Sequence, residues 1–202
     1  MMRTRFCNGY RSTMPEISIP RPPLTDGVVT LRLWRAADVP QRLAGYTDPQ
    51  FERFSLPSAG ELTEARVRAQ LEHDERERLL GTKVGLAIVD AADDDRVWGG
   101  CSLYDIDLEH RRAGVGYWLA AHARGRGAAT RTVGLLAQWA FAGLGLARLE
   151  LTCSPENIAS QRVAERAGFV REGILRSHIR FGDERRDSVL FSLLPEDSRG
   201  TE

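Results

Sequence analysis

Apolar and polar positions along the first eighty residues predict one strand followed by two helices. Residues 29–33 alternate strictly between apolar and polar side chains, which is the pattern of a half-buried strand. Residues 36–46 have the spacing of a short helix. Residues 61–80 form a long polar helical stretch, with Thr63 as the expected N-cap and Gly81 as the C-terminal stop.

The middle of the chain changes to a pattern of strands. Two apolar runs, residues 84–89 and 97–104, lie on either side of an acidic turn at residues 93–95. This arrangement predicts an antiparallel hairpin. A charged turn at residues 105–112 and another strand at residues 114–120 are expected to follow.

The next segment has a strand–helix–strand–helix pattern. A loop at residues 122–127 precedes a helix over residues 128–141, which carries one apolar face. A strand at residues 146–152 comes next, and then a second helix at residues 155–167 that Gly168 closes. This part of the chain therefore predicts one crossover between neighbouring strands.

Three further short strands complete the pattern, near residues 169–170, 174–181 and 188–194. Mostly antiparallel strands with one crossover predict a mixed α/β sheet, of the α+β kind, with flanking helices. A doubly wound parallel sheet is not expected. We expect a single domain at residues 24–194, a disordered or extended lead-in at 1–23 that ends in a proline-rich stretch, and a polar tail at 195–202.

Composition removes several classes of function. The 202 residues carry 28 basic and 28 acidic side chains, so the net charge is zero, and nucleic acid or an anionic membrane is not expected as a partner. Lys83 is the only lysine. Cys7, Cys101 and Cys153 are far apart and predict neither disulfides nor a metal site. With no signal-peptide pattern and no apolar run of membrane length, a cytoplasmic protein is expected.

The loop around Gly125 and Gly127 is the strongest candidate for a ligand site. Glycines between a strand and a helix let the backbone approach a ligand, and the N–H groups that begin the helix suit a phosphate. An ordinary glycine-rich turn with solvated arginines remains open. A P-loop is excluded because its lysine is missing. A dinucleotide fingerprint fails at Thr130, although Glu150 could imitate the ribose-binding acid.

Several motifs, in order, resemble one family. They are Leu31-Arg32-Leu33-Trp34-x-x-x-Asp38, Gly116-Tyr117-Trp118-Leu119, Arg124-x-x-Gly127-x-Ala129-Thr130, Ser154-Pro155-Glu156-Asn157-Ile158-Ala159-Ser160, Ala167-Gly168-Phe169-Val170-Arg171-Glu172-Gly173 and Gly182-Asp183-x-Arg185-x-Asp187. The set resembles the RimJ/RimL-type branch of the GNAT N-acetyltransferases. The resemblance covers roughly residues 25 to 194.

The resemblance implies a GNAT fold in which two neighbouring strands splay and acetyl-CoA, as co-substrate without a metal, lies in the gap. Backbone groups of Trp118 and Leu119 would pair with the pantetheine arm. Ser160 would protonate the leaving thiolate, and Asn157 would line the thiol end or simply cap its helix. The residues implied in cofactor contact are Tyr117, Trp118, Leu119, Arg124, Gly125, Arg126, Gly127, Ala128, Ala129, Thr130, Asn157 and Ser160.

The general base is not defined by the sequence. Many relatives carry a glutamate immediately before the Gly-Tyr-Trp-Leu strand, and here that position is Val115. Water along a polar channel is one alternative to a side-chain base. The remaining candidate bases are Asp105, Asp107, Glu109, His110 and His178.

The resemblance predicts acetyl transfer to a primary amine by direct attack in a ternary complex. The amine would belong to a protein N-terminus or to a small molecule. A homodimer is one option for the assembly. A non-catalytic acyl-CoA sensor is the competing class, and a dinucleotide-binding protein is a weaker one. Cys153 is expected to be a core residue and not an acyl carrier. The tryptophans are expected to fill the core and not to build an aromatic cage; they are Trp34, Trp98, Trp118 and Trp139.

Overall fold

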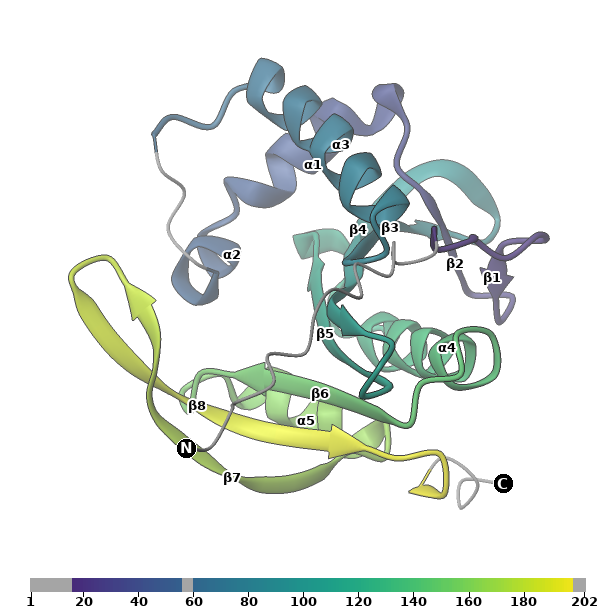
Figure 1. Cartoon of the computed structure of the whole chain (residues 1–202). Coiled ribbons are helices and arrows are strands. Elements are labelled where there is room, and N and C mark those ends of the chain that lie inside the picture. The colour runs from purple at the N-terminus through teal and green to yellow at the C-terminus, as the bar shows by residue number, and fades with distance from the viewer. Residues whose placement is uncertain (1–15, 56–59, 198–202) are drawn as a thin grey trace, which may run out of the picture.

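The computed structural model describes residues 16–55 and 60–197, which form one sheet with flanking helices (Figure 1). The strands are β1 (Leu24–Thr25), β2 (Val29–Leu33), β3 (Val84–Asp90), β4 (Asp93–Asp107), β5 (Arg112–Leu119), β6 (Arg148–Cys153), β7 (Val170–Phe181) and β8 (Glu184–Leu193). The helices are η1 (Ala36–Asp38), α1 (Val39–Tyr46), α2 (Pro49–Phe54), α3 (Glu64–Leu79), η2 (Ala121–Ala123), α4 (Ala128–Ala142) and α5 (Ile158–Arg166).

The strand order confirms the predicted fold class. The eight strands lie in the order β1-β2-β3-β4-β5-β6-β8-β7. Only β5 and β6 are parallel to each other, and the other neighbours are antiparallel. The dinucleotide-binding alternative is therefore wrong, because that fold needs a largely parallel sheet.

Two predicted turns are shorter than expected. Residues 93–95 belong to β4, and the chain reverses at residues 91–92, where Asp90 Oδ1 accepts a hydrogen bond from the Ala92 N–H at 3.0 Å. The predicted turn at 105–112 shrinks to four residues, because β4 continues to Asp107 and β5 begins at Arg112. Charged side chains occupy these strand ends because the ends are exposed.

Helix capping explains two further differences. The helix predicted at residues 155–167 is α5. It begins at Ile158 and not at residue 155, because Asn157 Oδ1 accepts from the Ser160 N–H at 3.1 Å and caps the helix.

The helix α2 was not predicted. Asp48 caps it by accepting from two backbone N–H groups, and Pro49 occupies its first position. An Asp-Pro pair of this kind is a helix-start signal that sequence reasoning had available.

The predicted cap of α3 is confirmed. The same helix also binds the part of the lead-in that the structure describes. Thr63 Oγ1 accepts from the Arg66 N–H at 3.3 Å, and Gly81 has a φ of 75° just past the helix. Ile17 is 2% exposed, and its carbonyl accepts from Arg78 Nη1 at 2.7 Å. Residues 1–15 of the predicted lead-in and 198–202 of the predicted tail lie outside the described residues.

The core lies between the helices and the sheet, and it contains two of the four tryptophans. Trp98 and Trp139 are buried, at 5% and 7% exposure, as predicted. Trp34 and Trp118 differ from the prediction, because they are only partly buried and stack on each other with ring centroids 6.2 Å apart. They lie beside a cavity and not within the main core cluster.

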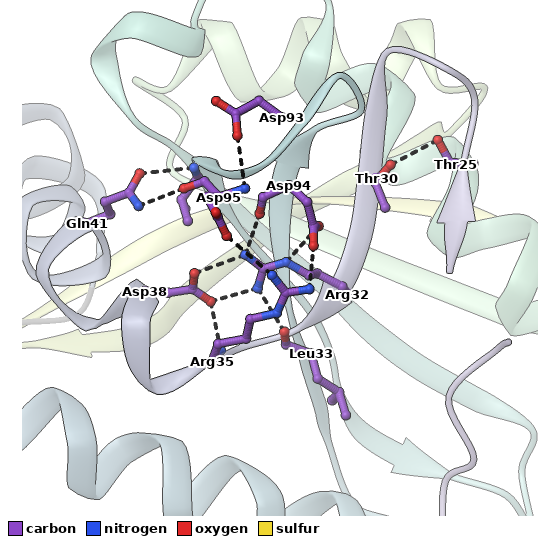
Figure 2. A network of polar contacts seen from close by, with 11 residues as sticks. Thr25, Thr30, Arg32, Leu33, Arg35, Asp38, Gln41, Asp93, Asp94 and Asp95 are labelled. Atoms are coloured by element: carbon purple, nitrogen blue, oxygen red, sulfur yellow. Dashed lines mark hydrogen bonds and ion pairs between the residues drawn. The ribbon is translucent and has the colours of Figure 1, made fainter. Parts of the chain in front are cut away.

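A buried ion pair fixes the start of α1 (Figure 2). Arg32 of β2 is 6% exposed and binds the Asp38 carboxylate through two nitrogens, at 2.7 and 3.0 Å. Arg32 Nε also donates to Asp94 Oδ1 at 2.9 Å, and Arg35 pairs with Asp94 as well. The Leu-Arg-Leu-Trp-x-x-x-Asp motif therefore ties β2, α1 and the β3–β4 hairpin into one unit.

Candidate active site

The strands β5 and β6 separate after three paired positions. Arg112, Ala113 and Gly114 pair with Arg148, Leu149 and Glu150, and beyond them β5 keeps its pairing with β4 alone. The gap is visible in Figure 1 as a divergence of the two strands. A cavity of about 560 Å³, called the main cleft, is lined by residues of both strands and of the helices that follow them. A parallel pair that splays in this way leaves one edge of β5 with unpaired backbone groups.

One end of the main cleft is the loop that begins α4. Gly125 and Gly127 have φ values of 73° and 74°, a backbone conformation that favours glycine, and Gly127 is the N-cap residue of α4. A side chain at either position would meet no atom within 4 Å. Both glycines are therefore required by backbone conformation and not by crowding. The first N–H groups of α4 face an open space that can receive an anion.

All of the residues implied in cofactor contact except Arg126 line the main cleft. They are Tyr117, Trp118, Leu119, Arg124, Gly125, Gly127, Ala128, Ala129, Thr130, Asn157 and Ser160. The Arg126 side chain is exposed.

Arg124 is bound to the protein itself. Its Nε and Nη2 donate to the Leu119 carbonyl at 3.1 and 2.9 Å, and Nη2 pairs with the Asp48 carboxylate. The hydrogen bond from Arg124 holds the pKa of the Asp48 carboxyl below its usual value. Arg124 thus connects the end of β5 to the start of α2.

The opposite end of the main cleft contains a pair of hydroxyl groups. Tyr117 Oη donates to Ser160 Oγ at 3.2 Å, and the two residues come from β5 and α5. Burial raises the pKa of Tyr117, although its hydrogen bond to Ser160 opposes the shift, so the phenol is protonated at neutral pH. The resemblance had assigned both residues to the cofactor but had not predicted their contact.

Cys153 borders the same end of the cleft and is partly buried. Burial raises the pKa of its thiol, and a hydrogen bond with Ser160 lowers it by less. The group is therefore a thiol at neutral pH and a poor nucleophile.

None of the candidate bases lines the main cleft. Asp105 is exposed, with a φ of 48°, and Glu109 is exposed in the turn before β5. Asp107 is occupied by His110, with Oδ2 and Nδ1 2.9 Å apart. His178 Nδ1 lies 3.0 Å from Ser188 Oγ on the long β7–β8 hairpin.

A second, smaller hollow of about 160 Å³ lies next to the main cleft and is called the side cavity. Both hollows include Gly116, Tyr117 and Trp118 in their walls. The other walls of the side cavity come from α1, α3, β3, β4 and the segment after β2. Sequence reasoning missed this cavity, since its residues come from helices that pack together only in the folded chain.

The indole of Trp118 separates α1 from the sheet beside the side cavity. A Cβ on Gly45 of α1 would lie 2.0 Å from the ring, and a Cβ on Gly100 of β4 would lie 2.5 Å from it. Tyr46 and Phe51 pack on the same indole, with centroids 5.4 and 5.9 Å away. The position of the Trp118 ring therefore depends on the absence of side chains at Gly45 and Gly100.

Comparison with known proteins identifies the class that this fold and site define. Residues 29–170 match the family model described as an acetyltransferase (GNAT) domain. The chain is 32% identical over 151 residues to the probable N-acetyltransferase YjcK of Bacillus subtilis, covering 74% of this chain and 83% of that protein. The chain belongs to the GNAT acetyltransferase family.

Two solved structures, of RimJ and of RimL, share the fold. RimJ of Mycobacterium smegmatis in complex with CoA-disulfide superposes with a TM-score of 0.78 at 24% identity, over 85% of this chain and 84% of RimJ. RimL, the ribosomal L7/L12 alpha-N-protein acetyltransferase, gives 0.73 at 19% identity, over 85% of this chain and 92% of RimL. Together with the family match, these findings define an acetyl-CoA-dependent acetyltransferase of RimJ/RimL-like fold.

The described residues contain neither a helix of membrane-spanning character nor a metal-binding cluster. Within residues 16–55 and 60–197, no helix is long and apolar enough to cross a membrane. In the same part of the chain, no group of three His, Cys, Asp or Glu side chains could hold a metal ion. Cys101 and Cys153 are free, and Cys7 lies outside the described residues.

Proposed function

We propose that this protein transfers the acetyl group of acetyl-CoA to a primary amine by direct attack in a ternary complex. The observation that supports this most strongly is the main cleft, which has anion-binding geometry at one end and two linked hydroxyls at the other. The free edge of β5 offers backbone groups to the pantetheine amides. The N–H groups around Gly125 and Gly127 offer donors to the pyrophosphate.

The chain's own residues supply the proton for the leaving group. As the amine nitrogen bonds to the thioester carbonyl carbon, the carbon–sulfur bond breaks and a thiolate leaves. Ser160 donates its proton to this sulfur, and the Tyr117 hydroxyl, which already donates to Ser160 Oγ, gives Ser160 a proton in return. Water, which takes up the proton that the amine loses, reprotonates the Tyr117 phenolate. Backbone N–H groups of Trp118 or Leu119 would stabilise negative charge on the carbonyl oxygen.

We propose that the proton of the amine leaves through water. The support is that the candidate bases lie away from both hollows. We expect the triple variant Asp105→Asn, Glu109→Gln, His178→Gln to retain kcat/KM within about threefold, because removing a true general base costs about a hundredfold or more. Initial rates of CoA release across pH 6 to 9 measure this. A hundredfold loss of kcat/KM in the triple variant would contradict proton loss through water and would mean that one of the three side chains is the general base.

The acceptor class is supported by the neighbours and by the open side cavity. RimL is named as an enzyme that acetylates the α-amine of a ribosomal protein. We propose a peptide N-terminus or a small primary amine as acceptor here. The side cavity and the main cleft share Gly116, Tyr117 and Trp118 as lining residues, so an acceptor in the side cavity would lie next to the cleft.

Ligand-induced stabilisation tests the binding step. We expect saturating acetyl-CoA to raise the Tm of the protein by several degrees, and NAD to leave it unchanged, because only acetyl-CoA has a site. A Tm unchanged by acetyl-CoA would contradict the proposal. Thiol release with a panel of amines then separates an enzyme from a sensor, since a sensor would bind acetyl-CoA and never liberate CoA.

A further inference from the structure

The separation of β5 from β6 needs a cause that lies between the two strands. β5 stays paired with β4 as far as Leu119, and β6 stays paired with β8 as far as Cys153. Both strands are therefore regular on their outer sides and lose only their pairing with each other. Neighbouring strands normally run about 4.8 Å apart, and continued pairing would bring Gly116 of β5 opposite Thr152 of β6. A side chain in this space would hold the two residues apart.

The side chain of Tyr104 reaches from β4 across β5 to β6. Tyr104 pairs with Gly114 of β5. A Cβ on Gly114 would lie 2.4 Å from the Tyr104 ring, and a Cβ on Gly116 would lie 3.5 Å from it. The ring therefore lies over the backbone at both glycines. The Tyr104 hydroxyl forms a hydrogen bond with the Thr152 side chain, and both residues line the main cleft. One side chain thus connects β4 to the residue of β6 that would otherwise pair with Gly116.

An irregularity of β4 directly follows Tyr104. Asp105 has a φ of 48°, and the register between β4 and β5 shifts between Tyr104 and Asp107. A bulge of this kind bends its strand and changes the direction in which a neighbouring side chain points. We therefore connect the left-handed backbone of Asp105 with the direction of the Tyr104 side chain.

The phenol of Tyr104 is a neutral group that is fixed at both ends. Burial raises its pKa, and the hydrogen bond with Thr152 opposes the shift by less, so the hydroxyl is protonated at neutral pH. A tyrosine buries a large apolar ring, but its hydroxyl needs a partner when it is buried. Because Thr152 supplies this partner, the position of the ring and the position of β6 are fixed together.

We propose that Tyr104 is a positioning residue that holds β5 and β6 apart and so keeps the edge of β5 open for the pantetheine arm of acetyl-CoA. The ring fills the space over the two glycines of β5, and its hydroxyl fixes the distance to Thr152. This inference rests on the proposed function, because the pairing of pantetheine with β5 belongs to that proposal.

Replacing the ring tests the proposal in the full-length protein. We expect Tyr104→Leu to raise the Kd for acetyl-CoA about 10- to 100-fold, because two backbone hydrogen bonds to the pantetheine arm would be lost. Tyr104→Phe keeps the ring and should raise this Kd only about fivefold. Isothermal titration measures the Kd, and a thermal melt measures the Tm of each variant.

Phe169→Leu is the matched control for Tyr104→Leu. Phe169 is 4% exposed and lines neither hollow. The control therefore also exchanges a buried aromatic ring for leucine and should lose Tm. Its Kd for acetyl-CoA should stay at the wild-type value, because the gap between β5 and β6 is unchanged.

Gly114→Ala tests the contact between the ring and β5. The added Cβ would displace the ring, so this variant should bind acetyl-CoA about as weakly as Tyr104→Leu. The double variant Gly114→Ala, Tyr104→Leu should show no further loss of affinity, because the ring has already been removed. Losses that multiply in the double variant would mean that the two residues act separately, which contradicts the proposal.

Thr152→Val removes the same hydrogen bond from the other strand. We expect it to raise the Kd for acetyl-CoA about as much as Tyr104→Phe does. The double variant Tyr104→Phe, Thr152→Val should bind no more weakly than either single variant, because all three lack one shared contact. Wild-type affinity in both single variants would show that the hydrogen bond does not set the width of the gap.

The remaining outcomes also decide the question. A folded Tyr104→Leu protein that binds acetyl-CoA within threefold of wild type, or no more weakly than Phe169→Leu, would overturn the proposal and leave acetyl transfer intact. If Tyr104→Leu does not fold, the comparison of Tyr104→Phe, Thr152→Val and their double variant decides. A wild-type protein that does not bind acetyl-CoA would defeat the proposed function together with this inference.

Discussion

Replacing Gly127 by valine is expected to weaken acetyl-CoA binding about a hundredfold while leaving a folded domain. Gly127 caps α4 at a φ of 74°, which costs an L-residue roughly 1–2 kcal/mol and a β-branched one more. The loop would relax and turn its N–H groups away from the pyrophosphate, and losing one or two charge-assisted hydrogen bonds accounts for about a hundredfold. Isothermal titration with acetyl-CoA measures the change in Kd.

Gly145→Val is the matched control for this substitution. Gly145 has a φ of 67°, and a Cβ there also meets no atom within 4 Å, but the residue lies between α4 and β6 and does not line the main cleft. Both variants should lose similar stability in a thermal melt. Only Gly127→Val should lose affinity. An equal loss of affinity in the two variants would mean that general destabilisation, and not the loop, controls binding.

Removing the Ser160 hydroxyl is expected to lower kcat about a hundredfold with little change in KM for acetyl-CoA. Protonation of a leaving group by a positioned side chain is worth a factor of about 10² to 10⁴. Ser160→Ala also removes the partner that accepts from Tyr117 at 3.2 Å. Steady-state rates of CoA release at saturating acetyl-CoA give the value.

The companion variant Tyr117→Phe separates direct from indirect roles. If Ser160 is the proton donor, Tyr117→Phe removes only the hydroxyl that donates to Ser160. The kcat of Tyr117→Phe should then fall less than that of Ser160→Ala. The reverse order would make Tyr117 the donor and Ser160 its support. A kcat within twofold of wild type in both variants would remove this pair from the chemistry.

Local patterns predicted the parts of the fold that depend on local physics. The strand β2, the cap at Thr63 and the glycines at 125 and 127 each reflect the conformation of a few residues, and the structure has them. The burial alternation of β2 fails at its end, because the ion pair with Asp38 buries Arg32 and Leu33 is left exposed. The strand lengths of β4 and β7 were not predictable in the same way. Most residues of β7 and the first residues of β4 are exposed, and pairing with a neighbouring strand, not burial, extends these strands.

The side cavity was outside the reach of the sequence because it depends on contacts between distant segments. Arg42 and Asp74 are 32 positions apart on two helices, and their ion pair exists only when α1 and α3 pack together. Charged residues on a predicted helix are normally assigned to a solvated face, and nothing in their spacing marks them as buried. The main cleft was predictable because ordered motifs identified β5, the loop before α4 and the start of α5, which all line it.

The packing of Trp118 against Gly45 and Gly100 has a consequence for how acceptor preference can change. The indole forms part of the wall that both hollows share, and it can stay there only while neither residue has a side chain. Adding one methyl group at position 45 or 100 would displace a large ring and merge or close the space beside it. Two positions that have no side chain of their own therefore set the dimensions of the side cavity.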